Sequence, residues 1–205
     1  MNPYLDNKLQ EQIVHTTKSA PYSIHYTYAP IDMAPALYLH WHSEMEYLYL
    51  VEGELLFQIE NQTFLLHAKE GIFIPAELLH TAKNTGNTPV SFFAFVFSSS
   101  FLISSFDTTS YNTYILPVIH NNLQFATVLH ESISWQKMIL DFLHQIFFEE
   151  NQNELHIRGL ALLMWDVLYQ NHISKIGVEK SLQTLSAQLA PALSYIQQNY
   201  QQEVS

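Results

Sequence analysis

The residues whose types could support chemistry gather in one short stretch, "HWHSEMEYLYLVEG", at positions 40–53. It opens with two histidines one residue apart, His40 and His42, and continues with Glu44 and Glu46. Residues two positions apart in a regular strand face the same side, so these four side chains are expected on one face. Two imidazoles and a carboxylate converging inside a barrel are a donor set that suits a divalent transition metal.

A fourth donor has to come from another strand, and His80 in "IPAELLHTAKN" has the right surroundings, just after a turn bounded by proline. The residues leave two other interpretations open. The same side chains could serve only as hydrogen-bond partners of a polar organic ligand, with no metal, or they could lie exposed at a barrel rim. In each case Glu46 is expected inside, whereas Glu44 is expected at the rim or behind the donors.

The elements that must position these residues are short strands between positions 22 and 97. The candidate strands are "YSIHYTY", "LYLHWH", "EYLYLV", "ELLFQIE", "TFLLHA", "GIFIP", "HTAKN" and "VSFFAFVF". Turn residues at 52–53, 61–62 and 85–87 predict tight hairpins between some of them. Such a series is typical of an antiparallel barrel or sandwich, and a barrel of this size can hold one small ligand.

After about Ser132 the apolar residues follow the 3–4 spacing of helices. The pattern predicts helices over Trp135–Phe148 and Leu155–Tyr169, joined by a polar loop into an antiparallel hairpin. Their apolar faces are wider than one barrel face can cover, which predicts a partner interface. In the competing account, the apolar segment 101–131 covers the remaining apolar surface of these helices within one chain.

The composition excludes several classes of function. The net charge is −11, with only 8 Lys plus Arg, and this field repels nucleic acid. Cysteine is absent, so disulfides and thiolate metal sites are excluded. No glycine-rich phosphate loop or GxSxG motif supports nucleotide binding or serine hydrolase chemistry. The sequence contains neither a membrane-spanning run nor a secretion signal, so a cytoplasmic protein is expected.

Two motifs carry a resemblance to a known family. The spacing His40-x-His42-x3-Glu46-x6-Gly53 resembles the first conserved motif of the cupin superfamily. The segment 69–84 resembles the second motif, with Pro75, His80 and Asn84 in register; it departs from the family at Lys69 and Glu77, where glycine is usual. The resemblance implies that the four metal ligands are His40, His42, Glu46 and His80. Imidazole ligands suit Zn, Ni, Fe and Cu alike, so the identity of the ion is open.

The order of the elements resembles the AraC-type family of bacterial transcription regulators. This resemblance implies a cupin-like barrel at 1–108 that senses a ligand, a helical dimerisation region at 109–172 and a linker at 173–188. Residues 189–205, which include "LAPALSYIQQNY", resemble the first helix of a helix-turn-helix domain that would be cut short at Ser205. The fold class is therefore expected to be α+β, a cupin-like antiparallel barrel followed by a helical hairpin.

The resemblance implies a sensor and not an enzyme. The chain is expected to form a homodimer and to reach DNA only through the missing C-terminal domain. Its expected effector is a small polar molecule, such as a sugar or sugar acid, bound by the four ligands with Tyr26 and Tyr38 nearby. Two alternatives stand beside this: a metal-dependent cupin enzyme, either an oxygenase or an isomerase, and a sugar-binding cupin with no regulatory role. The helical half favours the regulator, because catalysis in the barrel does not need it.

Overall fold

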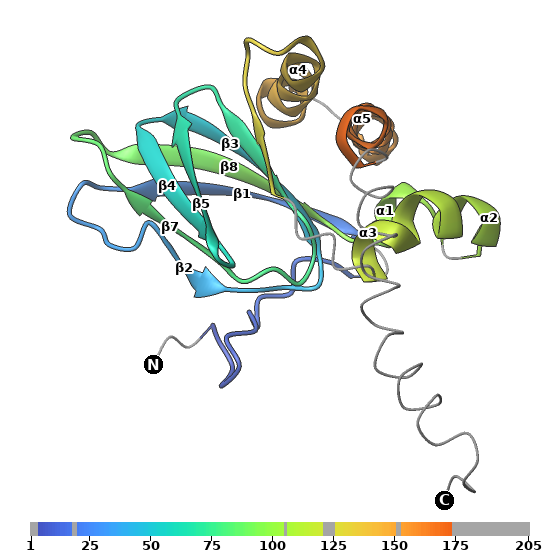
Figure 1. Cartoon of the computed structure of the whole chain (residues 1–205), viewed down its shortest axis with the longest axis horizontal. Helices are drawn as coiled ribbons and strands as arrows, with labels where there is room; N and C mark the ends of the chain where they lie inside the picture. The colour runs from blue at the N-terminus through green and yellow to red at the C-terminus, as the bar shows by residue number, and fades with distance from the viewer. Residues whose placement is uncertain (1–3, 18–19, 105, 121–125, 151–152, 174–205) are drawn as a thin grey trace, which may run out of the picture.

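The computed structural model describes residues 4–17, 20–104, 106–120, 126–150 and 153–173 (Figure 1). Nearly all of the predicted linker and the whole predicted final helix lie outside these residues. The strands are β1 (Tyr22–Ala29), β2 (Leu37–His40), β3 (Met45–Glu52), β4 (Glu54–Ile59), β5 (Gln62–His67), β6 (Gly71–Ile74), β7 (His80–Asn84), β8 (Val90–Phe97) and β9 (Thr127–Leu129). Every predicted strand is present, and the predicted fold class is confirmed.

The strands form two facing antiparallel sheets. One sheet has five strands in the order β1-β8-β3-β6-β9, and the other has four in the order β2-β7-β4-β5. Apolar side chains from both sheets meet between them, including Leu48, Phe57, Ile72 and Phe92. This interior core is enclosed by the sheets and is separate from the core beneath the helices.

Only one of the three predicted hairpin turns joins paired strands. β4 and β5 pair directly across the turn at residues 60–61. The turns at 52–53 and 85–87 instead carry the chain from one sheet to the other, because β3 and β8 lie in the five-stranded sheet while β4 and β7 lie in the four-stranded sheet. The prediction was wrong there because turn residues mark a reversal of the chain but do not specify which strands pair.

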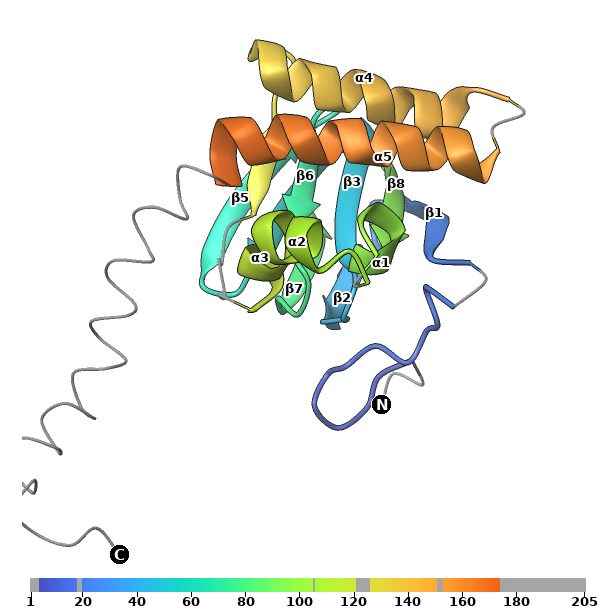
Figure 2. The ribbon, with the colours of Figure 1, turned by 90° about the vertical axis from the view of Figure 1, so that its right-hand side faces the viewer.

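The predicted helical hairpin is present as α4 (Ser134–Phe148) and α5 (Glu154–Leu168). The two helices lie side by side, with opposite chain directions, across the outer face of the five-stranded sheet (Figure 2). Leu143 of α4 and Met164 of α5 share a core with Tyr47, Phe73 and other residues that point outward from that sheet. A π-helical turn, η2 (Tyr169–Ile173), follows α5 directly.

Short helical elements fill the segment between β8 and β9. They are α1 (Ser99–Leu102), α2 (Thr108–Ser110), η1 (Tyr111–Ile115) and α3 (Leu116–His120). Phe101, Ile115 and Leu129 from this part of the chain are buried in the core beneath α4 and α5. The segment 101–131 therefore covers part of the apolar surface of the helices, as the competing account expected.

Strand β9 corrects the predicted domain boundary at residue 108. Its three residues, Thr127–Leu129, pair with β6 and form the edge of the five-stranded sheet. The barrel thus receives a strand from within the region predicted to be purely helical. Three residues are too few to show a strand period in the sequence. Within the part of the chain that the structure describes, no helix combines the length and apolar character needed to span a membrane.

Candidate metal and effector site

The three predicted histidines converge at one end of the space between the sheets. His40 ends β2, His80 begins β7 and pairs with His40 across the four-stranded sheet, and His42 lies in the segment leading to β3. All three are buried, and each offers a ring nitrogen within 4.8 Å of the others. Residues far apart in sequence therefore meet because β2 and β7 are neighbours in one sheet.

Backbone carbonyls orient each imidazole. His40 Nδ1 lies 2.8 Å from the Tyr38 carbonyl oxygen, His80 Nδ1 lies 2.8 Å from that of Leu78, and His42 Nδ1 lies 3.1 Å from that of Glu44. A carbonyl oxygen can only accept, so Nδ1 carries the hydrogen in each ring. In the neutral ring, Nε2 then presents its lone pair, which is the arrangement of a metal-binding histidine.

Glu46 approaches the same point from β3 in the facing sheet. Its Oε2 lies 3.2 Å from His42 Nε2 and 3.7 Å from His80 Nε2. Burial by itself would raise the pKa of Glu46, but the hydrogen bond with His42 and the charges of the neighbouring histidines lower that pKa to about 2. A carboxylate thus remains ionised in a buried site, where it requires a compensating positive charge.

A proton on His42 would supply such a charge in the metal-free site. Burial lowers the pKa of His42, but the hydrogen bond and charge of Glu46 outweigh this and raise it overall. Burial lowers the pKa of His40 and lowers that of His80 to about 3, so these two rings stay neutral at pH 7. A divalent cation bound here would take the place of the proton on His42.

The donor set fits a divalent metal. His80 Nε2 is buried and has no hydrogen-bond partner, although it faces the other two rings and Glu46. A buried polar atom without a partner is costly, and a metal ion would satisfy it. Three imidazole nitrogens and one carboxylate oxygen are ligands that Zn, Ni, Fe and Cu accept.

The two departures from the second cupin motif concern the backbone. Lys69 has φ of 74° and Glu77 has φ of 64°, the left-handed conformation that glycine adopts without strain. Each non-glycine residue there costs about 1–2 kcal/mol. The Glu77 amide donates to the His42 carbonyl oxygen at 2.8 Å, so this turn holds one of the histidines in place despite the substitution.

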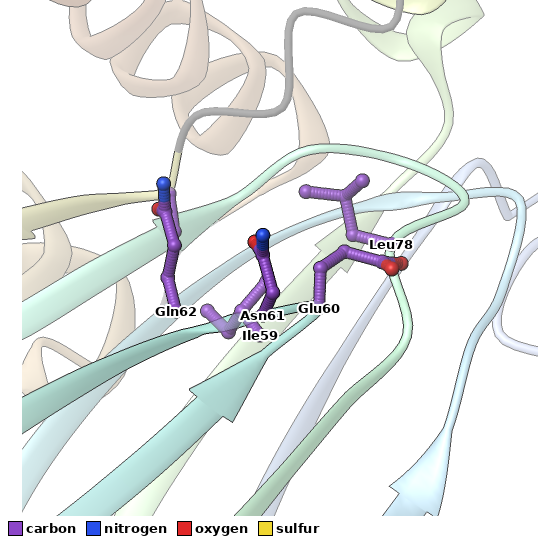
Figure 3. A pocket seen from close by; sticks show the side chains of 6 residues that line it. Ile59, Glu60, Asn61, Gln62 and Leu78 are labelled. Atoms are coloured by element: carbon purple, nitrogen blue, oxygen red, sulfur yellow. The ribbon is translucent and has the colours of Figure 1, made fainter.

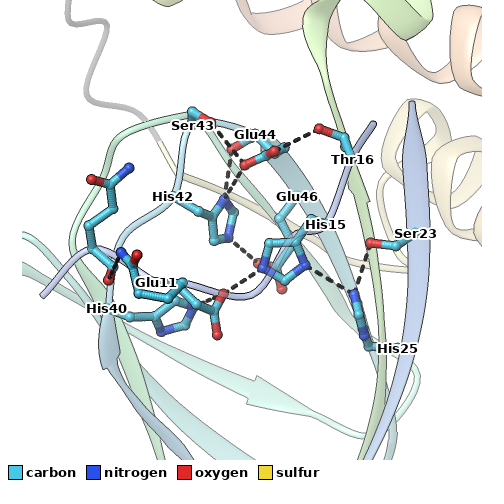
Figure 4. Close-up of polar contacts among 12 residues, drawn as sticks. Glu11, His15, Thr16, Ser23, His25, His40, His42, Ser43, Glu44 and Glu46 are labelled. Carbon is cyan, nitrogen blue, oxygen red and sulfur yellow. Dashed lines mark hydrogen bonds and ion pairs between the residues drawn. The ribbon is translucent and has the colours of Figure 1, made fainter. Parts of the chain in front are cut away.

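Glu44 lies outside the converging set, as expected. It contacts His42 on the Nδ1 side, at 3.9 Å, and its Oε1 accepts a hydrogen bond from the Thr16 hydroxyl at 2.8 Å (Figure 4). The expectation that residues 40 to 46 form one regular strand was wrong, since β2 ends at His40 and β3 begins at Met45. The interruption turns the Glu44 side chain away from the cluster.

The two tyrosines predicted to line the pocket lie in different places. Tyr38 is close to the cluster, with its ring centroid 4.8 Å from that of His40 and its hydroxyl donating to Glu11. Tyr26 is 58% exposed and packs on Phe93, whose ring also contacts the helices. The placement of Tyr26 in the pocket was wrong because Tyr26 is one residue from His25, the inward-facing residue of β1, and so points to the outer face.

Two further site residues come from the N-terminal segment and were not singled out in the sequence. Glu11 and His15 contact each other, with Glu11 Oε2 2.5 Å from His15 Nε2. His15 Nδ1 lies 3.1 Å from His25 Nε2, which in turn lies 2.9 Å from the Ser23 hydroxyl (Figure 4). The i,i+4 spacing of Glu11 and His15 was visible, but nothing local indicated that the segment lies over the barrel.

A second hollow lies apart from this polar cluster, beside the turn between β4 and β5. It is lined by Ile59, Glu60, Asn61, Gln62, Leu78 and Ala126 (Figure 3). Its volume of about 20 Å³ suffices for a water molecule and is too small for a sugar-sized effector. The buried polar cluster is therefore the stronger candidate for ligand binding.

Sequence comparisons agree with the motif and the fold. Residues 24–96 match the Cupin domain family, in agreement with the cupin-like fold described above. The whole chain is similar to the uncharacterized HTH-type transcriptional regulator YdeC of Bacillus subtilis, at 24% identity over 208 residues, covering 100% of this chain and 70% of that protein. An uncharacterized protein of Methanocaldococcus jannaschii, MJ1618, is 28% identical over 94 residues, covering 44% of this chain and 74% of that protein.

A solved structure shares the arrangement of the barrel and the helices. The structure of ToxT from Vibrio cholerae covers 77% of this chain and 58% of its own, with a TM-score of 0.51 and 9% sequence identity. At that identity the likeness concerns the fold alone. The similarity to YdeC along the whole chain confirms the predicted resemblance to a helix-turn-helix transcription regulator.

Proposed function

We propose that this chain is the ligand-sensing and dimerisation part of an AraC-type transcription regulator. The observation that carries the proposal is the similarity of all 205 residues to an HTH-type regulator, with the same chain holding a buried polar cluster in a cupin domain. An enzyme could use that cluster for catalysis. It would not need helices α4 and α5, which belong to the part of the chain that is similar to the regulator.

The sensing role rests on the cluster. His40, His42, Glu46 and His80 hold a divalent transition metal, a small polar effector such as a sugar or sugar acid, or both. A bound metal would act as a Lewis acid that attracts an oxygen of the effector. The chain's own residues would supply the hydrogen bonds that select the effector's shape, with Tyr38 at the edge of the site.

A thermal-shift screen of tag-free protein with metals, sugars and sugar acids tests this role. A ligand at about 100 times its dissociation constant stabilises the folded state by about 2.7 kcal/mol, which raises the melting temperature by roughly 5–10 °C for a chain of this size. The shift should vanish in His42→Ala and Glu46→Ala and persist in the rim variant Glu44→Gln. A ligand whose shift survives all three substitutions would bind elsewhere.

The dimerisation role rests on the helices. Although segment 101–131 covers part of their surface, Leu155 and Leu163 of α5 remain 79% and 49% exposed, and Met138 of α4 remains 47% exposed. Large exposed apolar side chains are typical of an interface. A two-fold contact between equivalent helices is the commonest arrangement, and it would hold two DNA-binding domains at a fixed spacing.

Sedimentation at micromolar concentration tests the dimer. Replacing Leu163 by Glu should raise the dimer dissociation constant about 30-fold or more if this residue lies at the centre of the interface. Gln58→Glu, an exposed change on the four-stranded sheet, serves as the matched control and should leave the dimer intact. A wild-type protein that sediments as a monomer would instead support the account in which segment 101–131 covers the apolar faces of the helices within one chain.

The DNA-binding role is assigned to a helix-turn-helix domain, to which residues 189–205 would contribute the first helix. With a net charge of −11, the present 205 residues should show no affinity for DNA by themselves. A mobility-shift experiment would compare this chain with a longer one that carries the helix-turn-helix domain. Only the longer chain should shift the DNA.

A further inference from the structure

The N-terminal segment, residues 4–17, lies against the end of the barrel that holds the histidines. It forms a loop beside β2 (Figure 2). The Glu11 amide donates to the Trp41 carbonyl oxygen at 2.9 Å, and the Trp41 amide donates to the Leu9 carbonyl oxygen at 3.1 Å. The Trp41 indole adds a bond to the Lys8 carbonyl oxygen at 3.0 Å. The residue between His40 and His42 therefore holds this segment in place.

These contacts bring the Glu11 carboxylate to the histidine cluster. The Glu11 side chain is 5% exposed, and its Oε2 lies 3.6 Å from His40 Nε2. That separation matches the 3.7 Å between Glu46 Oε2 and His80 Nε2. Glu46 thus approaches His42 and His80 from β3. Glu11 approaches the third histidine, His40, from the N-terminal segment (Figure 4).

Both oxygens of Glu11 are held by donors. The Tyr38 hydroxyl donates to Oε1, and His15 Nε2 lies 2.5 Å from Oε2. Carboxylates that ligate metals are usually oriented by such outer hydrogen bonds. Glu44 provides the contrast: it also lies beside a histidine of the cluster, but it faces Nδ1 of His42, the atom turned away from the other rings.

We propose that Glu11 is a fifth ligand of the divalent cation bound by His40, His42, Glu46 and His80. The inference rests on the proposed metal site and adds a ligand from outside the barrel. Its consequence is mechanical: a cation at the cluster would fasten segment 4–17 over the end of the barrel. Loss of the cation would leave that segment held by its bonds to Trp41, by the contacts of Glu11 with Tyr38 and of His15 with His25, and by the bond between Thr16 and Glu44.

Titration of the tag-free protein with Co²⁺ tests the proposal, because the visible absorption of Co²⁺ changes with the number and geometry of its ligands. In Glu11→Gln, Co²⁺ should bind about 10- to 100-fold more weakly, and its spectrum should change. Glu44→Gln, which removes another carboxylate that holds the same segment, should keep the wild-type spectrum and affinity. Circular dichroism of each variant would verify that it is folded.

Hydrogen exchange gives a second readout that does not depend on affinity. Co²⁺ should slow exchange of the Glu11 and Trp41 amides in the wild type and in Glu44→Gln, but not in Glu11→Gln. Equal Co²⁺ affinity and spectrum in wild type and Glu11→Gln would overturn the role of Glu11 and leave the four-ligand site intact. A wild-type protein that does not bind Co²⁺ would overturn the metal site and, with it, this inference.

Discussion

The central strands of the five-stranded sheet are buried on both faces, whereas the four-stranded sheet has an outer face open to solvent. In β3 every residue from Met45 to Leu50 is buried, and in β6 all four residues are buried. In β5 the residues Gln62, Thr63, Leu65 and His67 are exposed, while Leu66 points inward and is fully buried. Helices α4 and α5 cover the first sheet, and no helix described by the structure lies over the second.

The difference shows how one barrel separates packing from binding. The covered sheet carries a dense aromatic core on its helix side and contributes one of the four proposed ligands, Glu46. The open sheet contributes His40 and His80, at its end nearest the N-terminal segment. On β3, Glu46 faces the cluster while the next residue, Tyr47, faces the helices, so a single strand contacts both the proposed sensing site and the proposed dimerisation element.

The largest expected effect comes from truncating a buried side chain of the five-stranded sheet. Phe95 is fully buried and its ring lies 5.0 Å from that of Phe97 and 6.1 Å from that of Phe101. Phe95→Ala should lower the free energy of unfolding by about 3–5 kcal/mol, because the cavity cannot collapse in a core packed on both sides. Urea denaturation of the metal-free protein measures this change.

Leu65→Ala on the open sheet is the control for that experiment. Leu65 is 44% exposed on the outer face of β5, so its truncation should change the free energy of unfolding by about 0.5 kcal/mol or less. A loss of unfolding free energy as large as that of Phe95→Ala would mean that the outer face of the four-stranded sheet is covered in solution. The two sheets would then not differ in how their outer faces are covered.

Lowering the pH should reduce the free energy of unfolding by an intermediate amount, through the ionisable residues of the cluster between the two sheets. The pKa of Glu46 is lowered to about 2 in the folded state, so its stabilisation is present above the usual value of 4.5 and is lost as pH falls toward 2. The pKa of His80 is lowered to about 3, so the unfolded chain takes up a proton below 6.5 while the folded protein does not, and stability again falls. His42, whose pKa is raised, contributes in the opposite sense.

The net expectation is a loss on the order of 2 kcal/mol between pH 7 and pH 4 in the presence of a chelator. Urea denaturation at both pH values measures it. His80→Gln should flatten this dependence, whereas His67→Gln, on the exposed face of β5, should not alter it. A wild-type stability independent of pH over this interval would contradict the electrostatic account of the cluster.

The smallest expected effect concerns the outer surface of α5. A Cβ added at Gly159 would meet no atom within 4 Å, so Gly159→Ala should stabilise the helix by about 0.5–1 kcal/mol. Thermal unfolding at low protein concentration measures the change. If Gly159→Ala instead lowers stability, and lowers it more at higher protein concentration, then a second copy of the chain packs closely against Gly159. The helices over the five-stranded sheet would then form a dimer contact.

The local features were predictable from the sequence because short-range spacing encodes them. The two-residue period gave the strands from Tyr22 to Phe97, and the 3–4 spacing gave α4 and α5. The motif spacing identified His40, His42, Glu46 and His80 as one group, and the structure brings their side chains together. Each of these inferences depends on residues whose chemical types repeat or combine within a short window.

Only the tertiary structure decided which distant segments meet. Turn residues do not state whether a chain returns to the same sheet or crosses to the other, so the turns at 52–53 and 85–87 were misread. Strand β9 is too short to show a period, and it forms because an edge of β6 is available for pairing. Glu11 reaches the cluster through bonds to Trp41 made across the fold, and no pattern within the N-terminal segment can encode a contact whose other half lies 30 residues away in sequence (41 minus 11).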